Sequence, residues 1–180
     1  MKRRVKCAGL LPVLLLAACG GDREPAPQPG ETAEGPVAPA LPAGALPPQV
    51  ADFPALASKD CAEVVRFYLE ALGSREYARA ALVWNDPVID AARLEAVFGG
   101  YRQARVEAAD PAVEGAAGSL YCTVTGTLTD AADPAEPPVE GELTLRRVND
   151  VAGATPDQLR WTLRSSTFVE KLERSTQGQP

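Results

Sequence analysis

Two carboxylates have the spacing that acid–base chemistry needs. Asp86 and Asp90 lie four positions apart beside Trp84, and paired carboxylates can divide the roles of acid and base. Helix formation also explains both, because Asp86-Pro87 is typical of an N-cap followed by proline and Asp90 of an acidic first turn. We favour the structural interpretation and predict no catalytic residue.

The composition excludes several classes of site. The 180 residues include no histidine, which removes Ser–His and Cys–His nucleophile systems and every zinc site that needs histidine. The sequence shows no phosphate-binding loop, metal-ligand cluster or nucleophile elbow, so no metal or cofactor is predicted. A net charge of −6 argues against a nucleic-acid partner, which requires a basic face.

The first residues are typical of a targeting signal. Residues 1–6 are basic and residues 7–18 mostly apolar, a stretch shorter than the ~20 residues that span a membrane. The following segment, Leu16-Ala17-Ala18-Cys19-Gly20, resembles the lipobox of bacterial lipoproteins. The resemblance implies removal of residues 1–18 and lipidation of Cys19. The alternative is an ordinary signal peptide with an incidental cysteine.

The lipobox resemblance also implies a location. Gly20 stands where lipoproteins of the inner membrane carry Asp, so the expected place is the outer membrane, with the domain in the periplasm. Loss of four of the 18 basic residues leaves 14 against 24 acidic ones. Anionic headgroups would repel such a chain. Attachment must therefore come from the acyl chains on Cys19 and not from charge, and the predicted partner is the lipid bilayer.

Residues 19–57 are expected to form a disordered tether. Residues 20–57 contain 9 of the 17 prolines and many alanines, and such a composition has too little apolar surface to offset the entropy of ordering. Proline density favours an extended spacer. A docking peptide is the alternative.

The remaining chain predicts one α+β domain over residues 58–174, followed by a disordered tail at 175–180. Asp60 and Glu63 predict a capping box that starts a first helix ending at residues 73–74. A second helix is expected from Ser74 to Trp84 and a third from Asp86 to residues 99–100. Apolar and polar residues then alternate in four runs, which predict an antiparallel meander: 104–108, 120–125, 142–146 and 159–164.

This order of elements resembles the NTF2-like (cystatin-like) fold, in which three N-terminal helices pack on a curved four-stranded antiparallel sheet. Residues 64–72 and 73–77 are similar to the first two helices of that superfamily, and residues 145–151 to its late strand and hairpin. The chain most resembles small NTF2-like lipoproteins of Gram-negative bacteria whose role is uncharacterised. Enzymes of the superfamily often use an Asp–His pair, which this chain lacks.

Cys61 and Cys122 are the cysteines that remain after signal removal and lipidation, and both fall on expected core positions. In an oxidising periplasm such thiols are expected to pair. Free core thiols and a redox pair are the alternatives, although CxxC spacing is absent.

Aromatic side chains supply the candidate ligand site. Five of them could line an apolar pocket between the helices and the curved sheet, or simply fill the core: Tyr68, Trp84, Phe98, Tyr101 and Trp161.

Two surface features offer weaker hypotheses. Three arginines could share the outer face of the last two strands as an anion site, or remain a solvated face: Arg146, Arg160 and Arg164. A homodimer could form through a threonine face: Thr123, Thr125, Thr144 and Thr162.

The leading functional hypothesis is a non-catalytic domain that binds an envelope protein or a small apolar ligand. The alternative is an enzyme of the isomerase or cyclase type that uses carboxylate or tyrosine acid–base chemistry.

Overall fold

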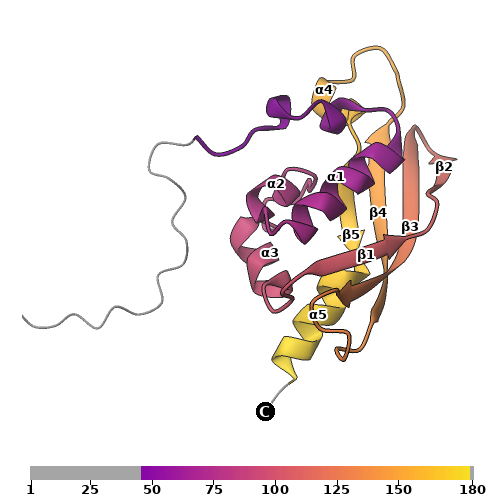
Figure 1. Cartoon of the computed structure of the whole chain (residues 1–180). Coiled ribbons are helices and arrows are strands. Elements are labelled where there is room, and N and C mark those ends of the chain that lie inside the picture. Colours follow the sequence, from indigo (N-terminus) through magenta and orange to yellow (C-terminus); the bar gives the residue numbers. More distant parts are fainter. Residues whose placement is uncertain (1–45, 179–180) are drawn as a thin grey trace, which may run out of the picture. The chain divides into compact units, whose positions relative to one another are not determined.

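The computed structural model describes residues 46–178 (Figure 1). The predicted signal, Cys19 and most of the predicted tether lie outside the described residues. Within residues 46–178, no helix has the length and apolar character needed to cross a membrane.

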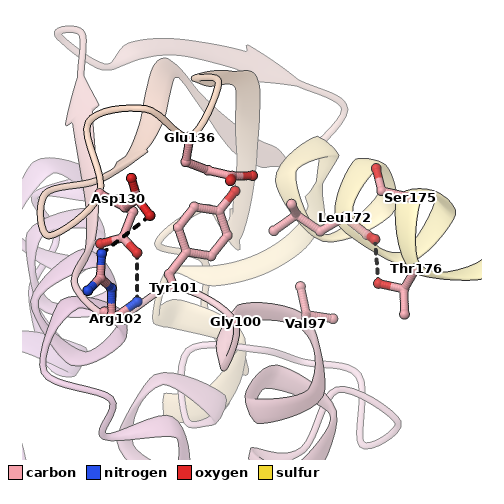
Figure 2. Close-up of a pocket in the computed structure, with 10 residues that line it drawn as sticks. Val97, Gly100, Tyr101, Arg102, Asp130, Glu136, Leu172, Ser175 and Thr176 are labelled. Carbon is pink, nitrogen blue, oxygen red and sulfur yellow. Dashed lines mark hydrogen bonds and ion pairs between the residues drawn. The ribbon is translucent and has the colours of Figure 1, made fainter. Parts of the chain in front are cut away.

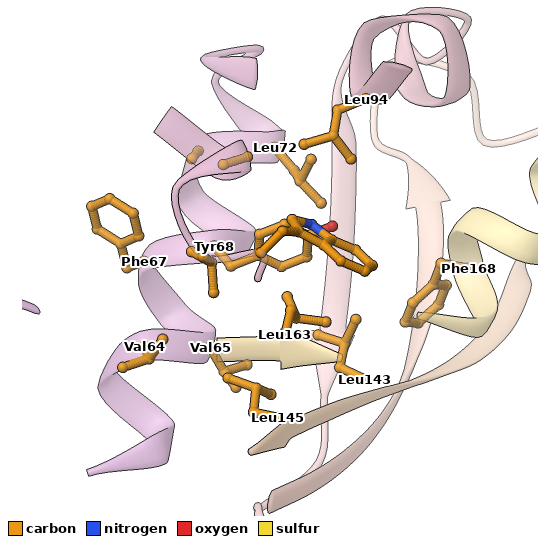
Figure 3. Packing of buried hydrophobic residues seen from close by; sticks show 14 of the residues in the cluster. Val64, Val65, Phe67, Tyr68, Leu72, Leu94, Leu143, Leu145, Leu163 and Phe168 are labelled. Carbon is orange, nitrogen blue, oxygen red and sulfur yellow. The ribbon is translucent and has the colours of Figure 1, made fainter. Parts of the chain in front are cut away.

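Three helices lie together on one face of the sheet: α1 (Cys61–Gly73), α2 (Tyr77–Ala81) and α3 (Ala91–Phe98) (Figure 1). Helix α1 begins where predicted, because Asp60 Oδ1 accepts a hydrogen bond from the Ala62 N–H at 2.9 Å. The predicted capping box does not form, because it would require the Asp60 side chain to accept from the N–H of Glu63 instead. The apolar face of α1 turns Val65 and Tyr68 toward the sheet (Figure 3).

The starts of the second and third helices differ from the prediction. Arg75 takes a positive φ of 60°, so Ser74 does not start a helix and α2 begins only after Glu76. Asp86 Oδ1 accepts from the Val88 N–H at 2.9 Å within a turn. The N-cap of α3 is Asp90, whose Oδ1 accepts from the Arg93 N–H at 2.8 Å.

The sheet has five antiparallel strands where the sequence predicted four: β1 (Ala104–Ala108), β2 (Ala112–Ala116), β3 (Ser119–Asp130), β4 (Val139–Val148) and β5 (Thr162–Ser166). The order is β1-β3-β4-β5, and β2 pairs with the first half of β3 while β1 pairs with its second half. Gly126 permits this close pairing, since a Cβ there would lie 2.8 Å from the Glu107 carbonyl oxygen. The last predicted strand begins later than expected because Thr155 caps a short helix, α4 (Pro156–Leu159).

The domain is longer than predicted at both ends. Two 3-10 turns, η1 (Val50–Asp52) and η2 (Pro54–Ala57), lie where a tether was expected, and Leu56 is fully buried. A further helix, α5 (Thr167–Gln177), extends into the expected tail. Arg93 fastens α3 to α5 through two bonds to Glu173, at 2.7 and 3.1 Å.

A disulfide joins Cys61 at the start of α1 to Cys122 in β3, as predicted, with Cα atoms 6.5 Å apart. Both cysteines are buried. Cys122 lies opposite Leu145 of β4 in the register, so the bond ties the helical layer to the middle of the sheet.

Candidate functional site

Four of the five predicted pocket aromatics lie in the close-packed core. Tyr68, Trp84, Phe98 and Trp161 are between 1% and 8% exposed. The rings of Tyr68 and Trp84 meet edge to face, with centroids 6.3 Å apart. Trp161 donates its Nε1–H to the Lys59 carbonyl oxygen at 2.9 Å. These four therefore behave as core residues, which was the alternative interpretation of the pattern.

Tyr68 and Trp84 are nevertheless unusual core residues. Within residues 46–178, neither the Tyr68 hydroxyl nor Trp84 Nε1 has a hydrogen-bond partner. Burial raises the pKa of Tyr68 far above its ordinary value. The phenol therefore stays protonated, and at 1% exposure it lies in the core, apart from the lining of the Tyr101 pocket described next.

Tyr101, the fifth aromatic residue, lines a pocket of about 600 Å³. The pocket lies between the end of α3, the segment that follows β3, and α5 (Figure 2). Its lining combines apolar, acidic, basic and hydroxyl side chains: Val97, Gly100, Tyr101, Arg102, Asp130, Asp133, Glu136, Leu172, Ser175 and Thr176. Apart from Tyr101, no lining residue was predicted from the sequence, because the loop after β3 and helix α5 carry no motif.

Asp130 fixes one wall of this pocket. Its carboxylate accepts three backbone N–H bonds, from Arg102 at 2.8 Å, Gln103 at 3.0 Å and Ala132 at 2.9 Å. Burial alone would raise the pKa of Asp130, but these donors outweigh it and hold the pKa below its ordinary value. Asp130 therefore carries its negative charge at ordinary pH and joins the start of β1 to the end of β3.

Tyr101 is the half-buried aromatic residue of the pocket. Figure 2 shows its hydroxyl pointing toward the Glu136 carboxylate. Burial, followed by the negative charges of Glu136 and Asp130, raises the pKa of Tyr101. The phenol is thus neutral at ordinary pH and available as a hydrogen-bond donor.

The charge of the pocket limits what it can hold. Arg102 is its one lining cation, and this side chain is engaged by the Ala132 carbonyl oxygen at 2.6 Å and by Asp133 at 3.3 Å. Asp130 and Glu136 leave the pocket negative, while Val97 and Leu172 supply apolar walls. This lining suits a small organic molecule that is neutral or cationic and disfavours an anion.

The paired carboxylates and two arginines of the predicted anion site have other partners. Asp86 and Asp90 each bond to a nearby backbone N–H, as described above. Arg146 donates to Ser119 Oγ at 2.7 Å, whereas Arg160 lies outside β5 and donates to the Leu82 carbonyl oxygen at 3.1 Å. The described part of the chain contains no group of three or more acidic or cysteine side chains placed to hold a metal ion.

The hydrogen bonds to the Asp130 carboxylate predict that folding stability depends on pH. A carboxyl whose folded-state pKa lies below its unfolded value of about 3.9 stabilises the fold above that pH, and the contribution is lost as the pH falls through the folded pKa. Urea midpoints should therefore fall as the pH drops below about 4, and Asp130→Asn should lower the midpoint at pH 7 while flattening this acid limb. Asp133→Asn is the matched control. Equal acid limbs for Asp130→Asn and the unsubstituted chain would contradict the assignment.

Two solved structures are similar to this chain. One, from Thiobacillus denitrificans ATCC 25259, is provisionally described as a calcium/calmodulin-dependent protein kinase type II association domain; it has a TM-score of 0.42 and 14% identity, covering 59% of this chain and 90% of that chain. The other, from Streptomyces avermitilis, is provisionally described as a dehydratase of the NTF2-like family; it has a TM-score of 0.42 and 13% identity, covering 63% of this chain and 95% of that chain. No protein-family model and no curated protein matches the chain. Both likenesses concern the arrangement of helices and strands alone.

Proposed function

We propose that the protein is an outer-membrane lipoprotein whose NTF2-like domain faces the periplasm and binds a small organic molecule without chemical conversion. The observation that carries the binding role is the mixed lining of the Tyr101 pocket, with a neutral phenol, three carboxylates and apolar walls around about 600 Å³. The lipobox at Cys19 and the basic and apolar segments before it support the anchor.

Native mass spectrometry tests the binding role. A Cys19→Ala chain, released without a lipid and purified without reduction, should carry a bound small molecule. Tyr101→Ala should lower the affinity for that molecule about tenfold, which corresponds to ~1.4 kcal/mol of lost binding free energy. Val88→Ala is the matched control, because Val88 is 61% exposed and lies away from the pocket. A mass without ligand, or equal occupancy in Tyr101→Ala, would contradict ligand binding here and favour a protein partner.

Cell fractionation tests the anchor separately. The unsubstituted protein should sediment with the outer membrane, and Cys19→Ala should move to the soluble periplasmic fraction. Two or more acyl chains hold a protein stably at a bilayer, so this change should be nearly complete. A Cys19→Ala protein that still sediments with the outer membrane would refute the anchor.

A second candidate function rests on the direction of the Tyr101 hydroxyl toward Glu136 (Figure 2). A neutral phenol beside a carboxylate could move a proton on a bound ligand, as an isomerase or cyclase requires. The ligand recovered by mass spectrometry distinguishes the two functions, because an enzyme would convert it and would lose turnover more than binding in Glu136→Gln.

A further inference from the structure

Residues 49–57, which we call the strap, form backbone hydrogen bonds only with neighbouring residues of the described chain. Asp52 N–H donates to the Gln49 carbonyl oxygen at 3.0 Å, and Leu56 N–H donates to the Phe53 carbonyl oxygen at 3.0 Å. Within the described chain, the only hydrogen bond that leaves the strap comes from the next residue, as Ser58 N–H donates to Ala55 at 3.2 Å. The backbone of the strap therefore folds on itself and makes no bond to the helices or the sheet.

Side chains alone hold the strap on the domain. The Phe53 ring lies 5.1 Å from the Phe67 ring of α1, measured between centroids. The Arg79 guanidinium of α2 lies over both rings, 5.2 Å from Phe53 and 4.7 Å from Phe67. Leu56 is fully buried in the core cluster. A surface pocket of about 460 Å³ lies beside these contacts, and Phe53, Phe67 and Arg79 are among the residues that line it.

From Lys59 onward, the chain is also joined to the rest of the domain by an ion pair, a hydrogen bond and a disulfide. Its ammonium pairs with Asp150 at 2.8 Å, and its carbonyl oxygen accepts the Trp161 indole N–H at 2.9 Å. Asp150 also pairs with the buried Arg147 at 2.6 Å. The disulfide follows at Cys61. Residue 59 therefore marks a boundary between a segment held by side-chain contacts alone and a domain whose apolar core is joined by ion pairs and a disulfide as well.

We propose that the strap is a releasable element, which detaches as a unit while residues 59–178 stay folded. Its release uncovers a groove that contains Phe67, Arg79 and the socket of Leu56. Local stability follows the contacts that a segment must break in order to open, and the strap breaks neither a strand pairing nor an ion pair. The proposal does not depend on the lipid anchor or on the Tyr101 pocket.

Amide hydrogen exchange of the whole chain tests the proposal. The amides of Phe53, Leu56 and Ser58 are expected to exchange at least ~100-fold faster than those of Cys122 and Leu145, with little dependence on low urea concentrations. Equal rates for the strap and the sheet, with the same dependence on urea, would overturn the proposal.

Substitution provides a second, independent readout. In Phe53→Ala/Leu56→Ala the strap amides should exchange at the rate of an unprotected peptide, while the amides of β3 and β4 remain protected and unfolding remains cooperative. Leu46→Ala is the matched control, because Leu46 is 84% exposed. Loss of cooperative unfolding in the double variant would show that the strap is an integral part of the core and would overturn the proposal.

Discussion

Replacing both bonded cysteines by alanine, in Cys61→Ala/Cys122→Ala, should lower the free energy of unfolding by about 4 kcal/mol. The disulfide closes a loop with a sequence separation of 61, and chain entropy sets a stabilisation of this size for such a loop. The melting temperature should fall by roughly 10–20 °C for a domain of this length. Urea unfolding of oxidised, unsubstituted protein against the variant measures the difference.

Val113→Ala is the matched control for this experiment. Val113 lies directly opposite Cys122 in the β2–β3 register and is 52% exposed, so its truncation should change stability by less than about 0.5 kcal/mol. Reduction of the unsubstituted protein should reproduce most of the effect of the double alanine variant. A loss below about 1 kcal/mol in both experiments would mean that the bond does not constrain the unfolded chain as the loop length requires.

Trp161→Ala should cost about 3–5 kcal/mol of folding stability, as expected for removal of a large buried aromatic side chain. Trp161 is 1% exposed, and the Arg147 guanidinium lies 5.9 Å from the centre of its ring. Trp161→Phe keeps an aromatic ring but loses the bond to the Lys59 carbonyl oxygen, which should cost about 1–2 kcal/mol. Thermal unfolding of both variants measures these losses.

This pair of variants separates the two interpretations of the aromatic cluster. If Trp161 lined a ligand pocket, Trp161→Ala would lose ligand binding and little stability. If it fills the core, stability falls in the order unsubstituted protein, Trp161→Phe, Trp161→Ala. Nearly equal stability for Trp161→Ala and the unsubstituted protein would reject the core assignment.

Features with a local physical signal could be predicted from the sequence. Helix α1 was found because Asp60 caps a clear apolar periodicity, and β1, β3 and β4 because one face of each alternates. Strand β2 has no buried residue, so alternation could not reveal it. The strap was missed because its two apolar anchors, Phe53 and Leu56, lie among prolines and alanines.

The candidate site was harder to predict than the fold. Tyr101 was selected as an aromatic residue near a helix end, but its neighbours come from the loop after β3 and from α5, which only the tertiary structure brings together. Asp130 shows the difficulty, since its role comes from three backbone N–H groups and not from any side-chain motif. The four core aromatics carried the same sequence signal as Tyr101, and burial alone distinguishes them.

The position of the disulfide has a consequence for the order in which the chain is completed. Cys61 and Cys122 enclose α1, α2, α3, β1 and β2, while β4, α4, β5 and α5 all follow the second cysteine. A chain made from its N-terminus can therefore form the disulfide before β4 and β5 have been synthesised. The C-terminal segment can then add β4 and β5 to a chain that is already cross-linked between α1 and β3, so the unfolded search for the last strand pairings starts from a closed loop.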